Sequence, residues 1–257
     1  MIVKRTPALI LLLAALALAA LGAGLYWRHR QKARTFPAPT NAEASSSLPP
    51  FGTKEPQRYQ ANRITSSHSS EAGAANQTDV SRVFLARDGD KRREDYDLEG
   101  ISISYLELPG ARYALLPSQK IYTDLNADDE IGPPGDAAAE FSPDRLLNES
   151  PAESTYELRG LEIINGRKAT KYRITTTNAT GTDWVKSETM IWIDQSLQLP
   201  LKSETVVSTN GEQSTVTTEL QNLSVDINGA IFELPLDFRK VSASEFERQV
   251  RIAVARN

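Results

Sequence analysis

The sequence predicts a mainly β protein (α+β) that begins with a membrane-spanning helix and continues as one large curved antiparallel sheet, an open half-barrel. Three observations lead to this fold class. An uncharged apolar run lies near the start of the chain, strand-like segments separated by turn residues fill most of the remainder, and helix start signals occur in two further places. After an anchor and a linker, about 200 of the 257 residues remain, enough for one sizeable β domain.

The apolar run extends from Ala8 to Trp27 and contains no charged residue. Its 20 residues would form a helix of about 30 Å, the thickness of the hydrocarbon core of a bilayer. Residues 1–35 are therefore predicted to be a retained membrane anchor with basic flanks. A cleaved signal peptide is the alternative, because Ala15-Leu16-Ala17 has the small-x-small form that signal peptidase accepts. The predicted anchor residues are Ala8, Leu13, Leu18 and the interfacial aromatics Tyr26 and Trp27.

Charge alone leaves the orientation of this anchor open. Two Lys or Arg residues precede the run and four follow it, which by the positive-inside rule would keep the following domain in the cytoplasm. Long domains nevertheless translocate despite flanking charge. Residues 36–55 are rich in Pro and Ser and are predicted to be a flexible linker. A coil of that length spans roughly 25 Å and would keep the domain near the membrane.

The composition excludes several classes of function. The first 35 residues hold six Lys and Arg and no acidic residue, so the remainder carries 23 basic against 33 acidic residues, a net charge of −10. Nucleic acid is therefore not a predicted partner, because its binding depends on basic contacts to phosphate. The absence of cysteine excludes disulfides, Cys-ligated metals and thiol catalysis.

From Gln57 onward, strand-like segments alternate with residues that favour tight turns. Asp88-Gly89-Asp90, Pro109-Gly110 and the Asn-Gly pairs at 165–166 and 210–211 all suit connections between antiparallel strands. Residues 56–257 are therefore predicted to form one half-barrel domain with an antiparallel sheet of roughly ten strands. The candidate strand segments are Arg58–Ser67, Thr78–Arg87, Lys91–Asp97, Ile101–Leu108, Arg112–Leu116, Lys120–Leu125, Tyr156–Ile164, Lys168–Thr177, Trp184–Asp194, Leu201–Thr209, Ser214–Leu223 and Ile231–Leu234.

Two helices are predicted within this domain. Ser142-Pro143-Asp144 offers an N-cap followed by Pro at the first helical position, which predicts a short helix near 143–149. This helix would follow an exposed insertion at 126–141. Ser242-Ala243-Ser244-Glu245 is a capping box that predicts a C-terminal helix to about residue 255, with Phe246, Val250 and Val254 on one face.

Six aromatic residues form the candidate ligand-binding set: Tyr96, Tyr105, Tyr113, Tyr122, Trp184 and Trp192. The four tyrosines recur at spacings of 9, 8 and 9, which places one on each strand of a meander. Two interpretations remain open for them, packing within the sheet or a line of aromatics across a concave face. The two tryptophans lie in one predicted strand, where they would either pack in the core or line a cavity.

Patterns that indicate catalysis are weak. His68 lies in a Ser-rich stretch that we predict to be a loop, and no nucleophile elbow is present. If the chain were an enzyme, His68, Asp88 and Asp90 would be the cluster to test. No acid–base constellation supports that interpretation, and no enzyme is predicted.

Metal-binding patterns are equally weak. The segment Asp124-x-Asn126-x-Asp128 begins like a calcium loop, but Asp129 stands where Gly is needed and Gly135 where a bidentate Glu is needed. Neither a metal site nor a cofactor is predicted.

Several short motifs, in a fixed order, resemble the bacterial outer-membrane lipoprotein-sorting group of carriers and their relatives. They span about residues 56–241 and comprise Pro56-Gln57-Arg58-Tyr59, Arg87-Asp88-Gly89-Asp90, Ile164-Asn165-Gly166-Arg167, Ile191-Trp192-Ile193-Asp194, Leu199-Pro200-Leu201-Lys202 and Phe232-Glu233-Leu234-Pro235. The resemblance implies an open half-barrel whose apolar concavity shields acyl chains of lipids or lipoproteins. The anchor, the linker, the insertion at 126–141 and the C-terminal helix depart from soluble carriers and favour a tethered protein over a free shuttle.

We therefore expect a membrane-tethered binding protein that holds a lipid or lipoprotein acyl chain in the concave face of the sheet. The resemblance favours a single-pass protein of the inner membrane with a periplasmic domain, and a soluble periplasmic protein is the alternative if the signal is cleaved. The alternative function is an extracytoplasmic sensor or interaction module that contacts another envelope protein. The expected partners are thus the bilayer, an acyl chain or lipoprotein, and an envelope protein.

Overall fold

The computed structural model describes residues 46–70, 78–98, 100–125, 153–180, 183–209 and 212–256. The apolar run at 8–27, the linker up to residue 45, the insertion at 126–141 and the helix predicted near 143–149 lie outside these residues. Within the described part of the chain, no helix is long and apolar enough to span a bilayer.

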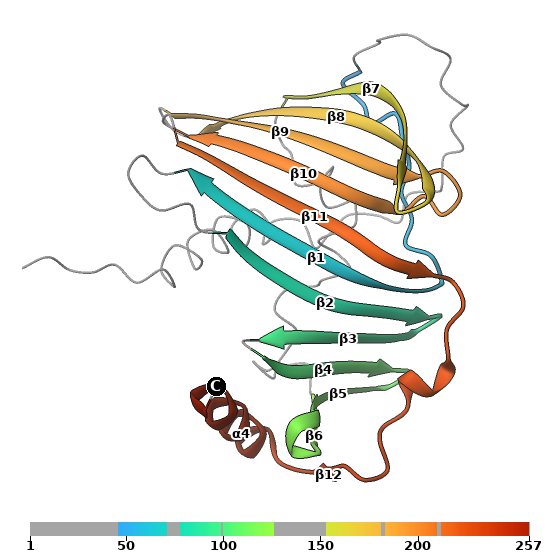
Figure 1. Ribbon diagram of the computed structural model, residues 1–257, viewed down its shortest axis with the longest axis vertical. Helices are drawn as coiled ribbons and strands as arrows, with labels where there is room; N and C mark the ends of the chain where they lie inside the picture. Colours follow the sequence, from blue (N-terminus) through green and yellow to red (C-terminus); the bar gives the residue numbers. More distant parts are fainter. Residues whose placement is uncertain are drawn as a thin grey trace, which may run out of the picture.

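The described residues form one curved sheet of twelve strands, open at both edges (Figure 1). Its order is β12-β6-β5-β4-β3-β2-β1-β11-β10-β9-β8-β7, and every pair is antiparallel except β12–β6. Two meanders, β1 to β6 and β7 to β11, are joined where β1 pairs with β11. The strands are β1 (Arg58–Ser70), β2 (Thr78–Asp88), β3 (Lys91–Leu98), β4 (Ile101–Leu108), β5 (Ala111–Leu116), β6 (Ile121–Asp124), β7 (Glu153–Ile164), β8 (Arg167–Thr180), β9 (Asp183–Asp194), β10 (Pro200–Thr209), β11 (Glu212–Ser224) and β12 (Arg239–Lys240).

The mainly antiparallel fold with a C-terminal helix is confirmed, and the turn residues explain much of it. Gly89, Gly110 and Gly166 adopt φ of +63°, +80° and +78° in the hairpin turns, where a side chain would be strained. Helix α4 (Ala243–Arg256) begins at the predicted capping box, in which the Ser242 hydroxyl accepts a hydrogen bond from the Glu245 amide at 3.3 Å.

One predicted strand was wrong. The strand expected at Ile231–Leu234 is instead the end of a 3₁₀ helix, η2 (Gly229–Phe232), because the Asn228 side chain accepts a hydrogen bond from the Ala230 amide and begins a helical turn. Of the three residues predicted on one face of α4, Phe246 and Val250 pack in the cluster against the sheet, whereas Val254 at the end of the helix is exposed.

The segment before β1, residues 46–57, is here named the strap, and the side of the sheet on which it lies is the strap face. Directly opposite residues in an antiparallel pair share a face. The register therefore places Leu220, Arg63, Val83, Tyr96 and Ile103 in one row across the strap face, on β11, β1, β2, β3 and β4. This row is buried, with exposed fractions of 2–5 %.

Two segments, the strap and α4, cover different parts of the strap face. The strap contacts the half formed by β7 to β10, whereas α4 covers β4 to β6, with Phe246 packed against Ile101, Leu116 and Ile121. The opposite face, here named the groove face, has its own cover over β2 to β6. There Ile227 and Phe232 pack on Ala86, Leu106 and Leu115. Each cover is a short single segment rather than a second sheet.

Asp194, which ends the Trp-Ile-Asp motif, fixes the turn between β9 and β10. Its side chain is 2 % exposed. One carboxylate oxygen accepts from Arg167 Nε at 2.5 Å, and the other accepts from the Ser196 and Leu197 amides at 2.8 and 2.7 Å. Burial opposes ionisation, but these hydrogen bonds outweigh it and hold the pKa of Asp194 below its ordinary value.

The Asp194→Asn variant of the full-length protein should lose about 2 kcal/mol of unfolding free energy at neutral pH, because hydrogen bonds to a charged acceptor contribute about 1.5–3 kcal/mol. Since the folded pKa is depressed, this stabilisation is present above the ordinary Asp pKa of about 3.9 and is lost as the pH falls through the folded pKa. Urea unfolding followed by tryptophan fluorescence at pH 7 and pH 3 measures both effects.

Asp88→Asn is the matched control for this measurement. Asp88 lies 3.9 Å from Arg58 in an exposed ion pair, so its loss should change stability by less than about 0.5 kcal/mol. A difference between wild type and Asp194→Asn that stays the same at pH 7 and pH 3 would contradict the proposed role of the carboxylate.

Candidate functional site

The strap is attached to the sheet at two points, the first of which is apolar. Ser46 forms an antiparallel bridge with Tyr156 of β7, through amide-to-carbonyl hydrogen bonds of 3.0 and 2.9 Å. The Phe51 ring then lies with its centroid 4.6 Å from that of Tyr172 and 6.1 Å from that of Tyr156. Phe51 is buried in a cluster completed by Ile174, Ile191 and Ile193 of β8 and β9. An aromatic side chain of the strap therefore fills an apolar site on the sheet.

The second attachment is a carboxylate clamp around Glu55. Tyr59 OH donates to Glu55 Oε1 at 2.9 Å, and Arg92 Nη1 donates to the same oxygen at 2.9 Å. Arg87 Nη1 and Arg92 Nη2 both donate to Glu55 Oε2. The register places the three donors opposite one another on β1, β2 and β3, because Tyr59 pairs with Arg87 and Arg87 with Arg92. The donors thus belong to the sheet and the acceptor belongs to the strap.

The clamp is partly shielded from water. The exposed fractions of the Arg87, Glu55 and Arg92 side chains are 16 %, 22 % and 30 %. Burial, together with the neighbouring Glu55 carboxylate, raises the pKa of Tyr59 well above its ordinary value. Tyr59 therefore stays protonated and acts as a hydrogen-bond donor to Glu55.

Residues 46–55 were predicted to belong to a flexible linker, yet they contact the sheet along this path. Lys54 N also donates to Gln198 O at 3.1 Å. The strap residues were not among the predicted site residues, because the Pro- and Ser-rich composition is typical of a linker. The one sequence signal was Phe51, a large aromatic residue directly after two prolines.

The four predicted tyrosines divide between the two faces. Tyr105 is directly opposite Ala114, and Leu106 is opposite Tyr113, so Tyr105 and Tyr113 point to opposite sides of the sheet. Tyr96 and Tyr105 pack edge to face on the strap face, with centroids 5.6 Å apart. Tyr113 and Tyr122 do the same on the groove face at 5.9 Å. They form two packed pairs rather than one continuous line, and their role in ligand binding stays a prediction.

The tryptophans lie in β9. Trp192 is on the groove face and is 3 % exposed. Its Nε1 donates to Glu162 at 2.6 Å, and the ammonium groups of Lys171 and Lys202 lie 4.6 and 5.0 Å from its ring. Trp192 is thus enclosed by charged side chains on the side opposite the strap. Trp184 lies opposite Ala179, and its side chain is outside the described part.

The structure does not bring the weak catalytic candidates together. His68 lies in β1, opposite Thr78, rather than in a loop, and Asp88 lies opposite Arg58 at the other end of the same strand pair. Ten residues of strand separate these ends by about 33 Å. Among the residues that the structure describes, no group of three His, Asp or Glu side chains is placed to hold a metal ion.

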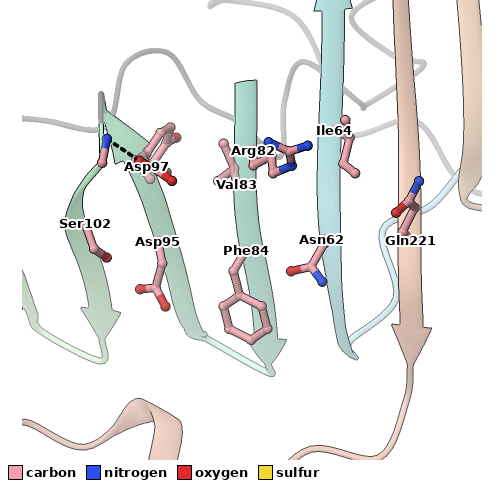
Figure 2. A pocket seen from close by; sticks show the side chains of 11 residues that line it. Asn62, Ile64, Arg82, Val83, Phe84, Asp95, Asp97, Ser102 and Gln221 are labelled. Carbon is pink, nitrogen blue, oxygen red and sulfur yellow. Dashed lines mark hydrogen bonds between the residues drawn. The ribbon is translucent and has the colours of Figure 1, made fainter. Parts of the chain in front are cut away.

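A groove with a volume of about 480 Å³ lies on the groove face. The residues that line it come from five neighbouring strands, β4, β3, β2, β1 and β11 (Figure 2). Phe84 and Ile64 supply apolar surface, while the remaining side chains are mostly polar or charged. The lining residues labelled in Figure 2 are Asn62, Ile64, Arg82, Val83, Phe84, Asp95, Asp97, Ser102 and Gln221. Of these, Val83 belongs to the buried row on the strap face.

The described fold therefore belongs to a class in which one open antiparallel sheet has its apolar faces covered by short segments. No known family model matches the sequence, and no curated protein matches it. Several solved structures do match the chain. A DUF1329 family protein from Desulfovibrio piger and a LolA superfamily protein from Nitrosomonas europaea each match with 14% identity and a TM-score of 0.27. Both alignments cover 69% of this chain, and 90% and 91% of the other chains.

A third solved structure similar to this chain is MucB in complex with MucA(peri). The identity is 15% and the TM-score 0.29, over 72% of this chain and 56% of that chain. A LolA superfamily protein is thus among the solved structures that are similar to this chain.

Replacing Phe51 by Ala should release the strap from the sheet without unfolding it. Truncating a buried Phe costs about 3–5 kcal/mol, and local opening is the first process that this loss favours. We expect the Ser46 and Lys54 amides, which donate to sheet or turn carbonyls, to exchange with deuterium about 100-fold faster. Leu48→Ala is the control, because Leu48 lies in the same strap and is 69 % exposed. Equal exchange in the two variants would show that Phe51 does not hold the strap.

Proposed function

We propose that this protein is a membrane-tethered binding protein of the cell envelope that holds a lipid or lipoprotein acyl chain on the strap face. The observation that carries the proposal is the cover of that face. Apolar side chains of both meanders line it, and the strap and α4 close it as short single segments. Such covers are displaced more readily than a second sheet, because each makes few apolar contacts.

The energetics favour exchange of the strap for an apolar chain. Burying one methylene group contributes about 0.8 kcal/mol, so a chain with ten buried methylenes gains roughly 8 kcal/mol before the cost of ordering it. Removing Phe51 from its cluster costs about 3–5 kcal/mol. An acyl chain can therefore replace the apolar attachment of the strap, whereas a ligand with two or three methylenes cannot.

A retained anchor at residues 8–27 would keep this binding site close to the membrane. The proposed arrangement is a single-pass protein of the inner membrane with the sheet on the periplasmic side. An apolar ligand would then come from, or be handed to, a membrane within reach of the tether. We propose that the protein binds its ligand and does not catalyse a reaction.

A second function is favoured by the groove on the opposite face. Its lining mixes amides, carboxylates, one guanidinium group and two large apolar side chains. That mixture is typical of a surface that contacts another protein and is a poor match for an acyl chain. Under this alternative the protein is a sensor or interaction module that contacts another envelope protein through β1 to β4.

A photoactivatable fatty acid distinguishes the two functions in the full-length protein reconstituted in nanodiscs. We expect crosslinks on strap-face peptides that contain Tyr172 and Ile191, and a several-fold increase in Phe51→Ala, in which the cover is weakened. Leu48→Ala should crosslink like the wild type. Crosslinks confined to residues 8–27, or equal on both faces of the sheet, would contradict lipid binding on the strap face.

The alternative function is tested with the full-length protein in native membranes. A photoreactive amino acid in place of Asn62 should capture an envelope protein if the groove is the working surface. Capture of lipid alone at that position counts against the interaction module.

A further inference from the structure

We propose that Tyr59, Arg87 and Arg92 form an oxyanion-binding site on the strap face, and that Glu55 is its resident occupant. The carboxylate or phosphate group of an amphiphilic ligand would replace Glu55 when the strap is displaced. The choice of an amphiphile rests on the proposed function, whereas the oxyanion site itself rests on the geometry of the clamp.

The donors are arranged for an oxyanion rather than for a particular side chain. Arg92 presents two nitrogens to the two oxygens of one carboxylate, the fork geometry that also suits phosphate. Arg87 and Tyr59 complete the set from the neighbouring strands. Because all of these donors lie on paired strands, their backbone positions do not depend on the strap. Arg87 Nε also donates to Gly89 O at 3.0 Å, a contact that does not involve Glu55.

The positive charges of Arg87 and Arg92 favour a bound anion in the site. Arg87 and Arg92 are directly opposite each other on β2 and β3, and like charges in that position destabilise a strand pair. Glu55 compensates this repulsion in a partly shielded setting. An anion that replaces Glu55 restores the compensation, whereas an uncharged ligand does not. The clamp should therefore select anionic amphiphiles over neutral ones of the same chain length.

The strap itself resembles such an amphiphile, because it carries an apolar group followed by a carboxylate. Phe51 fills an apolar site on β7 to β9, and four residues later Glu55 places a carboxylate between two guanidinium groups. Leu199 and Leu220 pack in one buried apolar cluster with Tyr59 of the clamp. An acyl chain that lies over β8 to β11 with its anionic end at the clamp would follow the same path. The strap and this ligand would compete for one surface.

Chemical rescue tests the oxyanion site in the full-length protein. Glu55→Ala should lower the melting temperature, and acetate or phosphate should restore it saturably, by about 4 °C at ten times the Kd, relative to chloride at equal ionic strength. Wild type, in which Glu55 fills the site, should not respond. Glu107→Ala is the matched control, since Glu107 is opposite Arg92 in β4 but is not part of the clamp. If Glu55→Ala does not fold, Glu55→Gln provides a variant that lacks the charge and keeps the shape.

Decanoate and decanol then separate the oxyanion site from the apolar one. Decanoate should bind Glu55→Ala at least tenfold more tightly than the wild type, and decanol should show no comparable preference. Equal gains for decanoate and decanol, or equal rescue of Glu55→Ala and Glu107→Ala by acetate, would overturn the oxyanion site and leave acyl-chain binding intact. Rescue by acetate without any binding of decanoate would support the oxyanion site and contradict the proposed function.

Discussion

The antiparallel pairing of β1 with β11 is the constraint on which the rest of the structure depends. It joins the first and last long strands of the sheet, from Gln60 opposite Ser224 to Ser70 opposite Gln213. Without it the chain would consist of two separate meanders, each with an additional open edge.

Because β1 lies at the centre of the sheet, the chain that precedes β1 must enter from one side. The strap therefore crosses the half formed by β7 to β10 before it reaches β1. For the same reason, the chain that leaves β11 crosses the half formed by β2 to β6, where η2 covers the groove face and α4 the strap face. The topology thus determines which segment covers which half.

The covers explain how a single open sheet buries enough apolar surface. The apolar parts of a sheet need a covering layer, and this sheet uses three short segments, each of which carries one buried Phe. The strap and α4 cover parts of the strap face, and η2 covers part of the groove face. The three buried phenylalanines have the same role, because each packs its segment against the sheet. They are Phe51 in the strap, Phe232 in the 3₁₀ helix η2 and Phe246 in α4. Polar contacts also hold the strap and the segment that contains η2. Arg58 and Arg93 donate to the carbonyls of Ile227 and Ile231, in the same way that the clamp holds Glu55.

The sequence predicted local features well because local chemistry determines them. Turn glycines and the capping box at Ser242 gave the hairpins and α4, whereas Asn228 converted an apolar run into a 3₁₀ turn. The faces of the tyrosines depend on strand register, which spacing alone does not define. In the regular pairing of β4 with β5, Tyr105 is opposite Ala114 and Leu106 is opposite Tyr113, so the two tyrosines lie on opposite sides of the sheet. The pairing of β1 with β11 joins residues more than 140 positions apart, and no local signal specifies it. The site at Glu55 was missed because its donors and its acceptor lie in segments of different composition, which only the folded sheet brings together.

The strap has two roles in the proposed function, and they are physically coupled. It covers the apolar site, and it is also the stretch of chain that connects the sheet to the N-terminal 45 residues. A ligand that displaces residues 46–57 therefore also lengthens the tether, by at most about 40 Å of extended chain. Binding would extend the reach of the domain from its anchor, and a shorter tether would oppose binding, because linked equilibria act in both directions. A membrane-tethered binding protein built in this way would hold its cover close to the anchor when empty and reach further when loaded. This coupling requires only that the cover and the tether be the same segment, which is the consequence of placing β1 at the centre of the sheet.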